Sequence, residues 1–488
     1  MGTVTAVVSE ARTREIDPRF AEEHETFRNE LASVARDGRR RWIYARQPKG
    51  RLYRARTVLS VFLLAFLFLA PFVTIGGQPV MLLDILHRHF VLLGVVFRPQ
   101  DFYLVVLIAL AVLVTLALST VVVGRVWCGW LCPQTVFMEM LFRRLEYLIE
   151  GSAEQQLRRN RGPWTRERAR RKVIKHAIFF ALSFAIANVF LAWIIGAKAL
   201  WVIVTDPPPQ HLAGLVAITI FSLVFYMVFA RFREQACVLA CPYGRVMSAL
   251  IDARTITVTY DTTRGEPRGR LTRTGAAPAR AHGDCIDCHQ CVTVCPTGID
   301  IRDGIQLECV NCTACIDACN DVMHRTGKAP GLIRLTSHHN VVKGKGRLLT
   351  ARALSYGTVW LVLLSAVTFL LVSRRPLDVL ILRQPGTMYT TVGADGVANF
   401  YNVQAFNRTS RATAFAIDVI EPPGATVTTL GPLDAVEPYA LLEGRLLVRV
   451  PAAALHGAST PVRFAVRTDG GVVQTVESAF LGPVRSDE

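Results

Sequence analysis

Long uncharged stretches alternate with basic segments through most of this chain. A helix needs about 20 apolar residues to cross the hydrocarbon core of a bilayer, and uncharged runs of that length are rare in soluble domains. Pro71 is expected to bend the first such helix or to end it. The pattern predicts five transmembrane helices, over Thr57–Gly76, Phe102–Val123, Ala177–Gly196, Leu212–Ala230 and Ala353–Ser373.

The last part of the chain has a different pattern, in which apolar and polar residues alternate over short runs. Turn sequences such as Pro422-Pro423-Gly424 and Asp469-Gly470-Gly471 separate these runs. Short strands at this spacing are typical of an immunoglobulin-like sandwich. This part contains no cluster of metal-ligating residues, and we interpret it as an interaction module. The expected strands are Asn399–Asn407, Thr413–Val419, Ala425–Leu430, Arg445–Val450, Val462–Arg467 and Val472–Phe480.

Composition agrees with a membrane protein, since 51% of the residues are hydrophobic. The formal net charge of +17 would suit a protein that binds nucleic acid. The distribution of this charge along the chain therefore has to show whether it reflects nucleic-acid binding or membrane topology. Lys and Arg number 13 before the first predicted helix, 2, 12, 1 and 17 in the four successive loops, and 10 after the fifth helix. This alternation is the positive-inside pattern. It predicts a multi-pass membrane protein with the N-terminus, the second loop and the fourth loop in the cytoplasm, and with the last part on the opposite side, which is the periplasm if the cell is bacterial.

The fourth loop contains the cysteine spacing of a bacterial ferredoxin twice. In this spacing three thiolates surround one [4Fe–4S] cluster, and the fourth, one turn later, ligates the neighbouring cluster. Two clusters with crossed ligand sets are therefore predicted, and their expected role is electron transfer. Cys285, Cys288, Cys291 and Cys319 should hold one cluster, and Cys309, Cys312, Cys315 and Cys295 the other.

Two other uses of these cysteines fit less well. Paired C-x2-C units also bind zinc, but eight cysteines in this doubled frame, with Pro296 after Cys295, suit iron–sulfur clusters better. A disulfide framework is disfavoured because the loop is expected in the reducing cytoplasm. Asn320 stands where a second proline would follow Cys319, and it is expected to alter the loop rather than the ligation.

A second cysteine motif occurs twice, at the cytoplasmic ends of two predicted helices. Cys128-x3-Cys132-Pro follows the second helix and Cys237-x3-Cys241-Pro follows the fourth, which suggests an internal repeat. Cysteines four residues apart share one face of a helix. The four thiols are expected to converge as a catalytic redox site, either as copper ligands, because sulfur selects Cu(I), or as thiols that exchange electrons through a disulfide. Inert buried cysteines are the alternative.

The apolar segment Val80–Phe97, between the first two predicted helices, is interrupted by charged and imidazole side chains. It is expected to lie along the outer interface or to re-enter the membrane. His87 and His89 are interpreted as ligands of copper or haem, or as ordinary interfacial residues.

These patterns together predict a multi-domain membrane protein. Its fold class is an α-helical bundle of about five transmembrane helices with a two-cluster ferredoxin insert and a C-terminal immunoglobulin-like β-sandwich. Within the insert, Thr255–Tyr260 is expected to form a strand. The basic second loop, Arg143–Lys175, predicts a pair of charged surface helices. The expected domains are a cytoplasmic extension over 1–56, four transmembrane helices with both C-x3-C-P motifs over 57–245, a cytoplasmic ferredoxin-type domain over 246–350, a fifth transmembrane helix over 351–373 and a periplasmic immunoglobulin-like domain over 374–488.

Several stretches carry a resemblance to a known family. They are Gly124-Arg125-Val126-Trp127-Cys128-Gly129, Arg233-Glu234-Gln235-Ala236-Cys237, Cys241-Pro242-Tyr243, Arg264-Gly265-Glu266-Pro267-Arg268-Gly269, Gly283-Asp284-Cys285-Ile286-Asp287-Cys288 and Val294 through Gly304. Together they resemble the FixG/CcoG (RdxA) family of cytochrome c oxidase accessory proteins. The resemblance covers nearly the whole chain beyond residue 40.

The resemblance implies assembly of a cbb-type haem–copper oxidase through reduction of Cu(II) to Cu(I). A cytoplasmic donor would reduce the clusters, and copper at Cys128, Cys132, Cys237 and Cys241 would take the electrons and leave as Cu(I). The implied partners are that donor, a copper chaperone or transporter, oxidase subunits and membrane lipid, without nucleic acid. The twin C-x3-C-P motifs are also similar to quinol-oxidising subunits of nitrate and nitrous oxide respiration, so a quinone-linked electron relay is one alternative. A non-enzymatic assembly scaffold is another.

Overall fold

The computed structural model forms two compact units. We call residues 1–73 and 105–365 the helical unit, and residues 74–104 and 366–488 the sandwich unit. The structure describes residues 32–34, 37, 39–75, 78–84, 89–92, 94–98, 101–270, 283–306, 308–344, 350–386, 388–392, 396–468 and 470–483.

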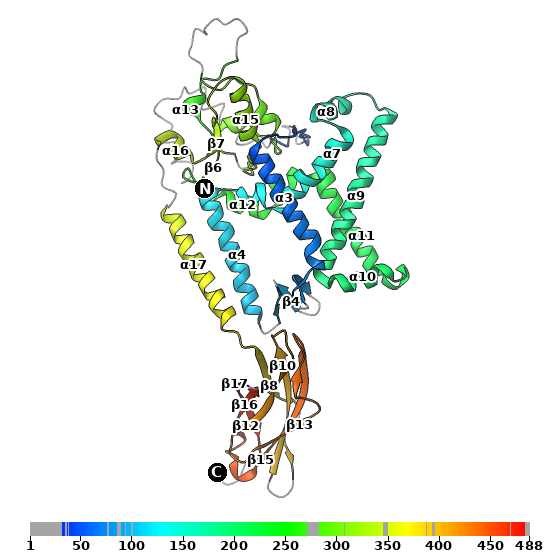
Figure 1. Cartoon of the computed structure of the whole chain (residues 1–488), viewed down its shortest axis with the longest axis vertical. Helices are drawn as coiled ribbons and strands as arrows, with labels where there is room; N and C mark the ends of the chain where they lie inside the picture. The colour runs from blue at the N-terminus through cyan, green and yellow to red at the C-terminus, as the bar shows by residue number, and fades with distance from the viewer. Residues whose placement is uncertain are drawn as a thin grey trace. The chain divides into compact units, whose positions relative to one another are not determined.

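Within the described residues, five helices are long and apolar enough to cross a membrane, which confirms the five predicted from the sequence. They are α3 (Arg51–Leu69), α4 (Phe102–Val123), α9 (Arg166–Ile195), α11 (Leu212–Met227) and α17 (Ala351–Val372). Figure 1 shows α9 and α11 side by side, joined by α10 (Ala197–Thr205). On α17, Trp360 donates its ring N–H to the Thr115 hydroxyl of α4 at 2.8 Å. The last helix therefore pairs with the second.

Two helix ends differ from the prediction. The helix α3 ends at Leu69 and passes into a 3-10 turn over Ala70–Phe72, because Pro71 lacks the N–H that would continue it. The predicted extension to Gly76 is therefore wrong, and Thr74–Ile75 is a short strand, β1. The helix α9 begins at Arg166 instead of Ala177, because the Thr165 hydroxyl caps it by accepting from the Arg168 N–H at 3.2 Å.

The basic loop between α4 and α9 contains the predicted pair of helices, α7 (Arg143–Glu150) and α8 (Ala153–Arg161). A capping box between Ser152 and Gln155 begins α8. Not all of the charges lie on the surface, as had been expected of this loop. Glu146 and Glu150 of α7 are 4% and 6% exposed and both contact Lys175 of α9.

A ferredoxin-like part of the helical unit lies in the chain between α11 and α17. Its core includes Tyr260, Ile301, Met323 and Leu332. The predicted strand Thr255–Tyr260 forms, although it begins at Thr257. The elements are β6 (Thr257–Tyr260), α13 (Thr262–Gly265), α14 (Gln290–Thr293), a 3-10 turn (Ile301–Asp303), α15 (Ala314–Arg325), β7 (Ile333–Thr336) and α16 (His338–Lys343), with β6 and β7 paired antiparallel.

The end of α4 is one attachment point of this ferredoxin-like part. The last carbonyl groups of a helix have no partner within the helix. Here the Val121 carbonyl accepts from the Thr255 hydroxyl at 3.0 Å, and the Val122 carbonyl accepts from the Ile256 N–H at 3.0 Å. The chain that leads into β6 therefore completes the hydrogen bonding of a membrane helix.

The start of α3 is a second attachment point. The Asp317 carboxylate of α15 accepts from the backbone N–H of Leu52 at 3.3 Å and from that of Tyr53 at 2.7 Å. Gly50 lies against the same carboxylate, where a side chain would collide with it. A negative charge also suits the positive end of a helix dipole. The ferredoxin-like part is thus joined to two membrane helices at their ends.

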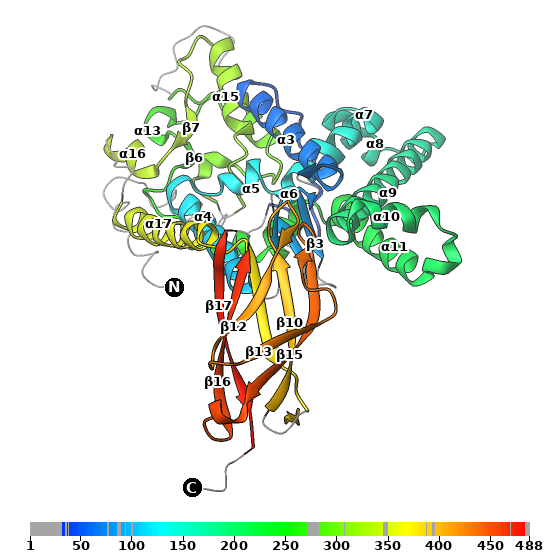
Figure 2. The same cartoon turned by 60° about the horizontal axis from the view of Figure 1, so that its bottom comes forward.

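The sandwich unit packs two antiparallel sheets face to face, which confirms the predicted immunoglobulin-like architecture. The strand orders are β13-β15-β10-β8 and β12-β16-β17, and Figure 2 shows both sheets. Tyr401, Phe464 and Phe480 are fully buried between them. The strand β8 lies before the first predicted strand. The bounds are β8 (Leu377–Arg383), β10 (Gly396–Asn407), β12 (Ala416–Glu421), β13 (Thr426–Leu430), β15 (Leu441–Pro451), β16 (Ser459–Thr468) and β17 (Gly471–Leu481).

The apolar segment after α3 forms a small sheet of this unit, and its expected place at the outer membrane interface stays a prediction. Val91 packs against Phe406 of β10. Asp101, which is 3% exposed, forms ion pairs with Arg374 at 2.5 Å and with Arg408 at 3.0 Å. Val91, Val96 and Phe97 are therefore covered by protein, whereas Leu83 and Val95 are exposed. The strands are β3 (Met81–Asp84), β4 (His89–Leu92) and β5 (Val95–Phe97), paired in that order.

Candidate metal centre

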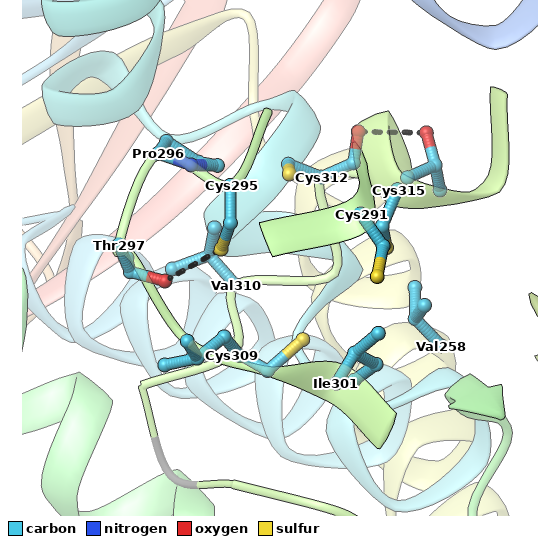
Figure 3. Close-up of a pocket in the computed structure, with 12 residues that line it drawn as sticks. Val258, Cys291, Cys295, Pro296, Thr297, Ile301, Cys309, Val310, Cys312 and Cys315 are labelled. Carbon is cyan, nitrogen blue, oxygen red and sulfur yellow. Dashed lines mark hydrogen bonds between the residues drawn. The ribbon is translucent and has the colours of Figure 1, made fainter. Parts of the chain in front are cut away.

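The eight cysteines of the doubled motif line two cavities in the ferredoxin-like part. What we call the proximal cavity is lined by Cys295, Cys309, Cys312 and Cys315, and the distal cavity by Cys285, Cys288 and Cys319, while Cys291 lines both. Each cavity has about 350 Å³ of space free of protein atoms. Figure 3 shows the sulfur atoms of the proximal cysteines turned toward the space between them.

This division has the crossed arrangement that the spacing predicts for the ligands. Cys295, the last cysteine of the first motif, lines the proximal cavity, whereas Cys319, the last of the second, lines the distal one. Cys315 and Cys319 are one turn apart on α15. That helix therefore runs past both cavities and contributes a thiol to each. The ligation itself stays a prediction.

The lining of both cavities fits an iron–sulfur cluster better than a single ion. Besides the thiols it is largely apolar, with Val258 and Ile299 in the proximal cavity and Met323 and Leu332 in the distal one. Among the described residues, no three His, Cys, Asp or Glu side chains stand close enough to hold one metal ion. The thiols surround a volume instead of a point, which disfavours zinc. All of the cysteines are free thiols, which speaks against a disulfide framework.

Burial raises the pKa of the thiols of Cys291, Cys295, Cys309, Cys312, Cys315 and Cys319. The pKa of Cys291 and of Cys309 rises to about 12, and that of Cys312 and of Cys319 to about 11. At neutral pH such thiols stay protonated until a metal binds them as thiolates. Loading of the two cavities therefore releases protons.

A buried arginine lines the distal cavity. Arg302 is 4% exposed and donates to the carboxylates of Asp300 and Asp287, each at 2.6 Å. It also contacts the His289 ring nitrogen at 2.8 Å. Arg302 thereby joins the loop around Cys288 to the turn after the first motif, and its charge is paired with the two carboxylates. Sequence reasoning missed it, although it lies in one of the stretches that carry the family resemblance.

Each C-x3-C-P motif is one helical turn that ends before its proline. The first cysteine of each motif lies within the turn, and the second, Cys132 or Cys241, is extended. Proline disfavours helical backbone in the residue before it and suits the first turn of the next helix. The expectation that both cysteines share one helix face is therefore wrong. The elements are α5 (Val126–Trp130), α6 (Pro133–Thr135), a π-helical turn (Ala236–Ala240) and α12 (Pro242–Ser248).

The structure nevertheless brings the four thiols of the two motifs together. Cys237 interacts electrostatically with Cys128, Cys132 and Cys241, and Cys132 interacts with Cys241. Burial raises the pKa of Cys237 to about 12 and also raises that of Cys128 and Cys132. The thiols of Cys128, Cys132 and Cys237 are therefore protonated at rest. Their role as copper ligands or redox thiols stays a prediction.

The first C-x3-C-P motif lies directly against the loop of the proximal cavity. Gly129 packs on the backbone of Val310 and Cys312, and a Cβ at Gly129 would lie 2.9 Å from the Cys312 N and Cα atoms. Only glycine permits so close an approach. The buried Asn311 strengthens this junction, because its side-chain amide donates to the Val123 carbonyl at 3.4 Å. The residue after Cys128 thus touches a predicted cluster ligand.

Two buried cations flank the proximal cavity. Arg125, which is 4% exposed, hydrogen-bonds the Cys128 thiol, and its charge also acts on Cys309. Arg56 of α3 is 3% exposed, and its charge acts on Cys312. Cations in these positions favour the thiolate form and offset the charge of a bound cluster.

Buried ion pairs hold the chain that leads into the second motif. The Glu146 carboxylate accepts from Arg233 at 3.0 Å and from Lys175 at 3.3 Å. Burial alone would raise the pKa of Glu146, but the two cations outweigh it and the pKa is lowered. Glu234, which is 1% exposed, pairs with Arg40 at 2.9 Å. These contacts fix the backbone a few residues before Cys237.

The two histidines considered as ligands fall elsewhere. His89 begins β4 of the sandwich unit, and His87 lies outside the described residues. Their role stays a prediction.

Three family models match the chain. A 4Fe-4S dicluster domain matches residues 232–338, a 4Fe-4S binding domain matches residues 105–151, and the immunoglobulin-like fold at the C-terminus of FixG matches residues 367–483. The first match contains all eight cysteines of the two cavities, and the second contains the first C-x3-C-P motif. The chain is therefore an iron–sulfur protein.

Curated relatives match over most of the chain. Protein RdxA of Cereibacter sphaeroides is 33% identical over 473 residues, which cover 90% of this chain and 97% of the relative. Nitrogen fixation protein FixG of Rhizobium meliloti is 31% identical over 432 residues, which cover 80% of this chain and 82% of the relative. Protein RdxB of Cereibacter sphaeroides is 31% identical and covers 77% of this chain. With this coverage and the FixG C-terminal domain in place, the chain belongs to the FixG/RdxA family of iron–sulfur proteins.

Proposed function

We propose that this chain is a cupric reductase of the bacterial inner membrane, which supplies Cu(I) for assembly of a cbb-type oxidase. When bound, [4Fe–4S] clusters supply one-electron carriers. We further propose that the ferredoxin-like part faces the cytoplasm and the sandwich unit the periplasm, because Lys and Arg are concentrated in alternate loops. The resemblance to the oxidase accessory family supports this function.

One observation carries the proposal, the contact of Gly129 with Cys312. It joins the first C-x3-C-P motif to the proximal cavity through directly packed backbone. The second motif reaches the same place, because Cys241 and Cys237 interact with the thiols of the first. An electron held at the proximal cavity is therefore next to four sulfur atoms that prefer Cu(I).

The chemistry requires one electron for each copper ion. We call the thiols of Cys128, Cys132, Cys237 and Cys241 the membrane-edge thiols. Cu(II) bound by them takes one electron and becomes Cu(I), and the electron comes from a one-electron donor on the cytoplasmic side. In a thiol route, two thiols would reduce two Cu(II), form one disulfide and release two protons, and two electrons from the donor with two protons would restore the thiols. Both routes consume one electron per Cu(I).

The exposure of the cysteines suggests where the donor binds. Cys288 of the distal cavity is exposed, whereas Cys128 at the membrane edge is buried. We therefore expect a cytoplasmic donor at the distal cavity. A copper chaperone or transporter would accept Cu(I) from the membrane-edge thiols, and oxidase subunits would bind the sandwich unit.

The test is copper reduction by the purified protein under anaerobic conditions. The protein is reduced, freed of reductant, and mixed with Cu(II) and a Cu(I)-specific chelator, while cluster absorbance is followed. We expect about two Cu(I) per chain, one for each cluster that is reoxidised. Replacement of the four membrane-edge cysteines by serine should abolish the reaction while the iron content is retained.

A Tyr401→Phe variant is the control, because Tyr401 is buried in the core of the sandwich unit. Copper reduction at the normal rate by the quadruple serine variant would contradict the proposal. Clusters that stay reduced with Cu(II) but reoxidise with a quinone analogue would instead identify a quinone-linked relay. Oxidase assembly that survives loss of both clusters would identify a scaffold.

A further inference from the structure

The strand β6 passes both cavities and presents a different side chain to each. Val258 lines the proximal cavity and Tyr260 lines the distal cavity. Residues two apart in a strand point to the same side, so the same face of β6 borders both cavities. The proximal cavity receives only a methyl surface from this strand, whereas the distal cavity receives a phenol.

The hydroxyl group of Tyr260 is buried without a polar partner. The residue is 4% exposed, and its oxygen has no hydrogen-bond partner within the part of the chain that the structure describes. A tyrosine hydroxyl that is buried normally finds a partner. Gly265 leaves the room that this hydroxyl occupies, since a side chain at Gly265 would overlap it. The site is therefore shaped to hold the hydroxyl.

The sulfur atom of Cys285 is the group that the hydroxyl faces. Cys285 lines the same cavity as Tyr260, belongs to the same buried cluster, and acts on the hydroxyl electrostatically. A neutral thiol is a weak acceptor that also carries a proton, whereas a thiolate only accepts. Ligation of iron by Cys285 would thus turn the weak acceptor that Tyr260 already faces into a strong one.

We propose that the Tyr260 hydroxyl donates a hydrogen bond to the Cys285 thiolate and thereby raises the reduction potential of the distal cluster. Hydrogen bonds to the ligand sulfurs are among the determinants of cluster potentials. The added electron increases negative charge on the sulfurs, so a donor stabilises the reduced form more than the oxidised form. Val258 offers no such donor to the proximal cluster. The inference rests on cluster ligation and is independent of copper as the acceptor.

The test is a redox titration of Tyr260→Phe, followed by electron paramagnetic resonance. Phenylalanine keeps the ring, over which the Arg268 guanidinium lies at 5.8 Å, and removes only the hydroxyl. We expect the equilibrium constant for reduction of the distal cluster to fall about tenfold, which lowers its potential by about 59 mV for one electron. The potential of the proximal cluster should not move. A Cys315→Ser variant, which should lack the proximal cluster, assigns the two signals.

The matched control is Tyr401→Phe. Tyr401 is a fully buried tyrosine of the sandwich unit, and its hydroxyl donates to the Ala479 carbonyl at 2.9 Å. Its removal should leave both potentials unchanged. A second variant, Tyr260→3,5-difluorotyrosine, makes the hydroxyl a stronger donor and should raise the distal potential.

Three results would overturn the proposal. One is an unchanged distal potential in Tyr260→Phe with full iron content. Another is an equal shift of the reduction potentials of both clusters, which would mean that the substitution loosens the ferredoxin-like part as a whole. If Tyr260→Phe fails to hold the distal cluster, the fluorinated variant decides, and a distal potential that does not rise would refute the hydrogen bond. Failure of copper reduction would leave these measurements unaffected, so the two proposals can fail separately.

Discussion

Replacement of Gly129 by alanine tests the contact on which the proposed electron route depends. The new Cβ would lie 2.9 Å from the Cys312 N and Cα atoms, whereas ordinary contacts between carbon atoms are about 3.5–4.0 Å. The two segments must therefore separate by about 1 Å, the shortfall in that contact distance. Overpacking of this kind costs about 1–3 kcal/mol, which is about 5- to 150-fold in the equilibrium between touching and separated arrangements.

We expect the rate of Cu(I) formation by Gly129→Ala to fall by a factor in that range. The assay measures the initial rate with a Cu(I)-specific chelator, at matched iron content. Gly357→Ala is the control, because it adds the same methyl group to α17 where nothing lies within 4 Å. A Gly129→Ala protein with full iron and an unchanged rate would refute the reasoning, since the contact would then have no part in electron transfer.

Further predictions concern stability and metal content. Glu146→Gln leaves the charge of Arg233 without its carboxylate, while Lys175 keeps Glu150, and should cost about 3–5 kcal/mol, seen as a lower thermal unfolding midpoint of the detergent-solubilised protein. Because the pKa of Glu146 is lowered, its contribution is complete above the ordinary carboxyl pKa and is lost as the pH falls through the lowered value. A midpoint difference between the two proteins that persists in strong acid would therefore contradict the ion pairs. Asp317→Ala removes the cap of α3 and should cost about 0.5–2 kcal/mol; an unchanged midpoint would show that the cap contributes nothing. Cys315→Ser should reduce the bound iron from about eight to about four atoms per chain, measured by mass spectrometry; full iron would contradict the proximal ligand set.

The sequence was sufficient for features that depend on local patterns. Uncharged runs located the five membrane helices, and the cysteine spacing predicted which thiols share a cavity. Helix ends were less predictable. The helix α9 begins at its cap, Thr165, so its first part is charged and precedes the apolar run. Hydropathy alone does not record where a capped helix leaves the apolar region.

Features that depend on partners distant in sequence were missed. In β4 and β5, Val91 and Val96 are buried against Phe406, and no local pattern reveals that contact. The spacing of Cys128 and Cys132 could not show that Gly129, which lies between them, touches Cys312. The alternation of β6 predicted a strand but could not show that Val258 and Tyr260 face different cavities.

The cap on α3 also has a consequence for biogenesis. Asp317 follows Leu52 by 265 residues, so the first membrane helix emerges from the ribosome long before the group that completes its N-terminus exists. Because Asp317 lies between Cys315 and Cys319 on α15, the cap depends on the segment that folds around iron. If Cys315 and Cys319 ligate iron as predicted, maturation of the metal centre completes the cap of the first helix, and a chain starved of iron would carry an unfinished helix end.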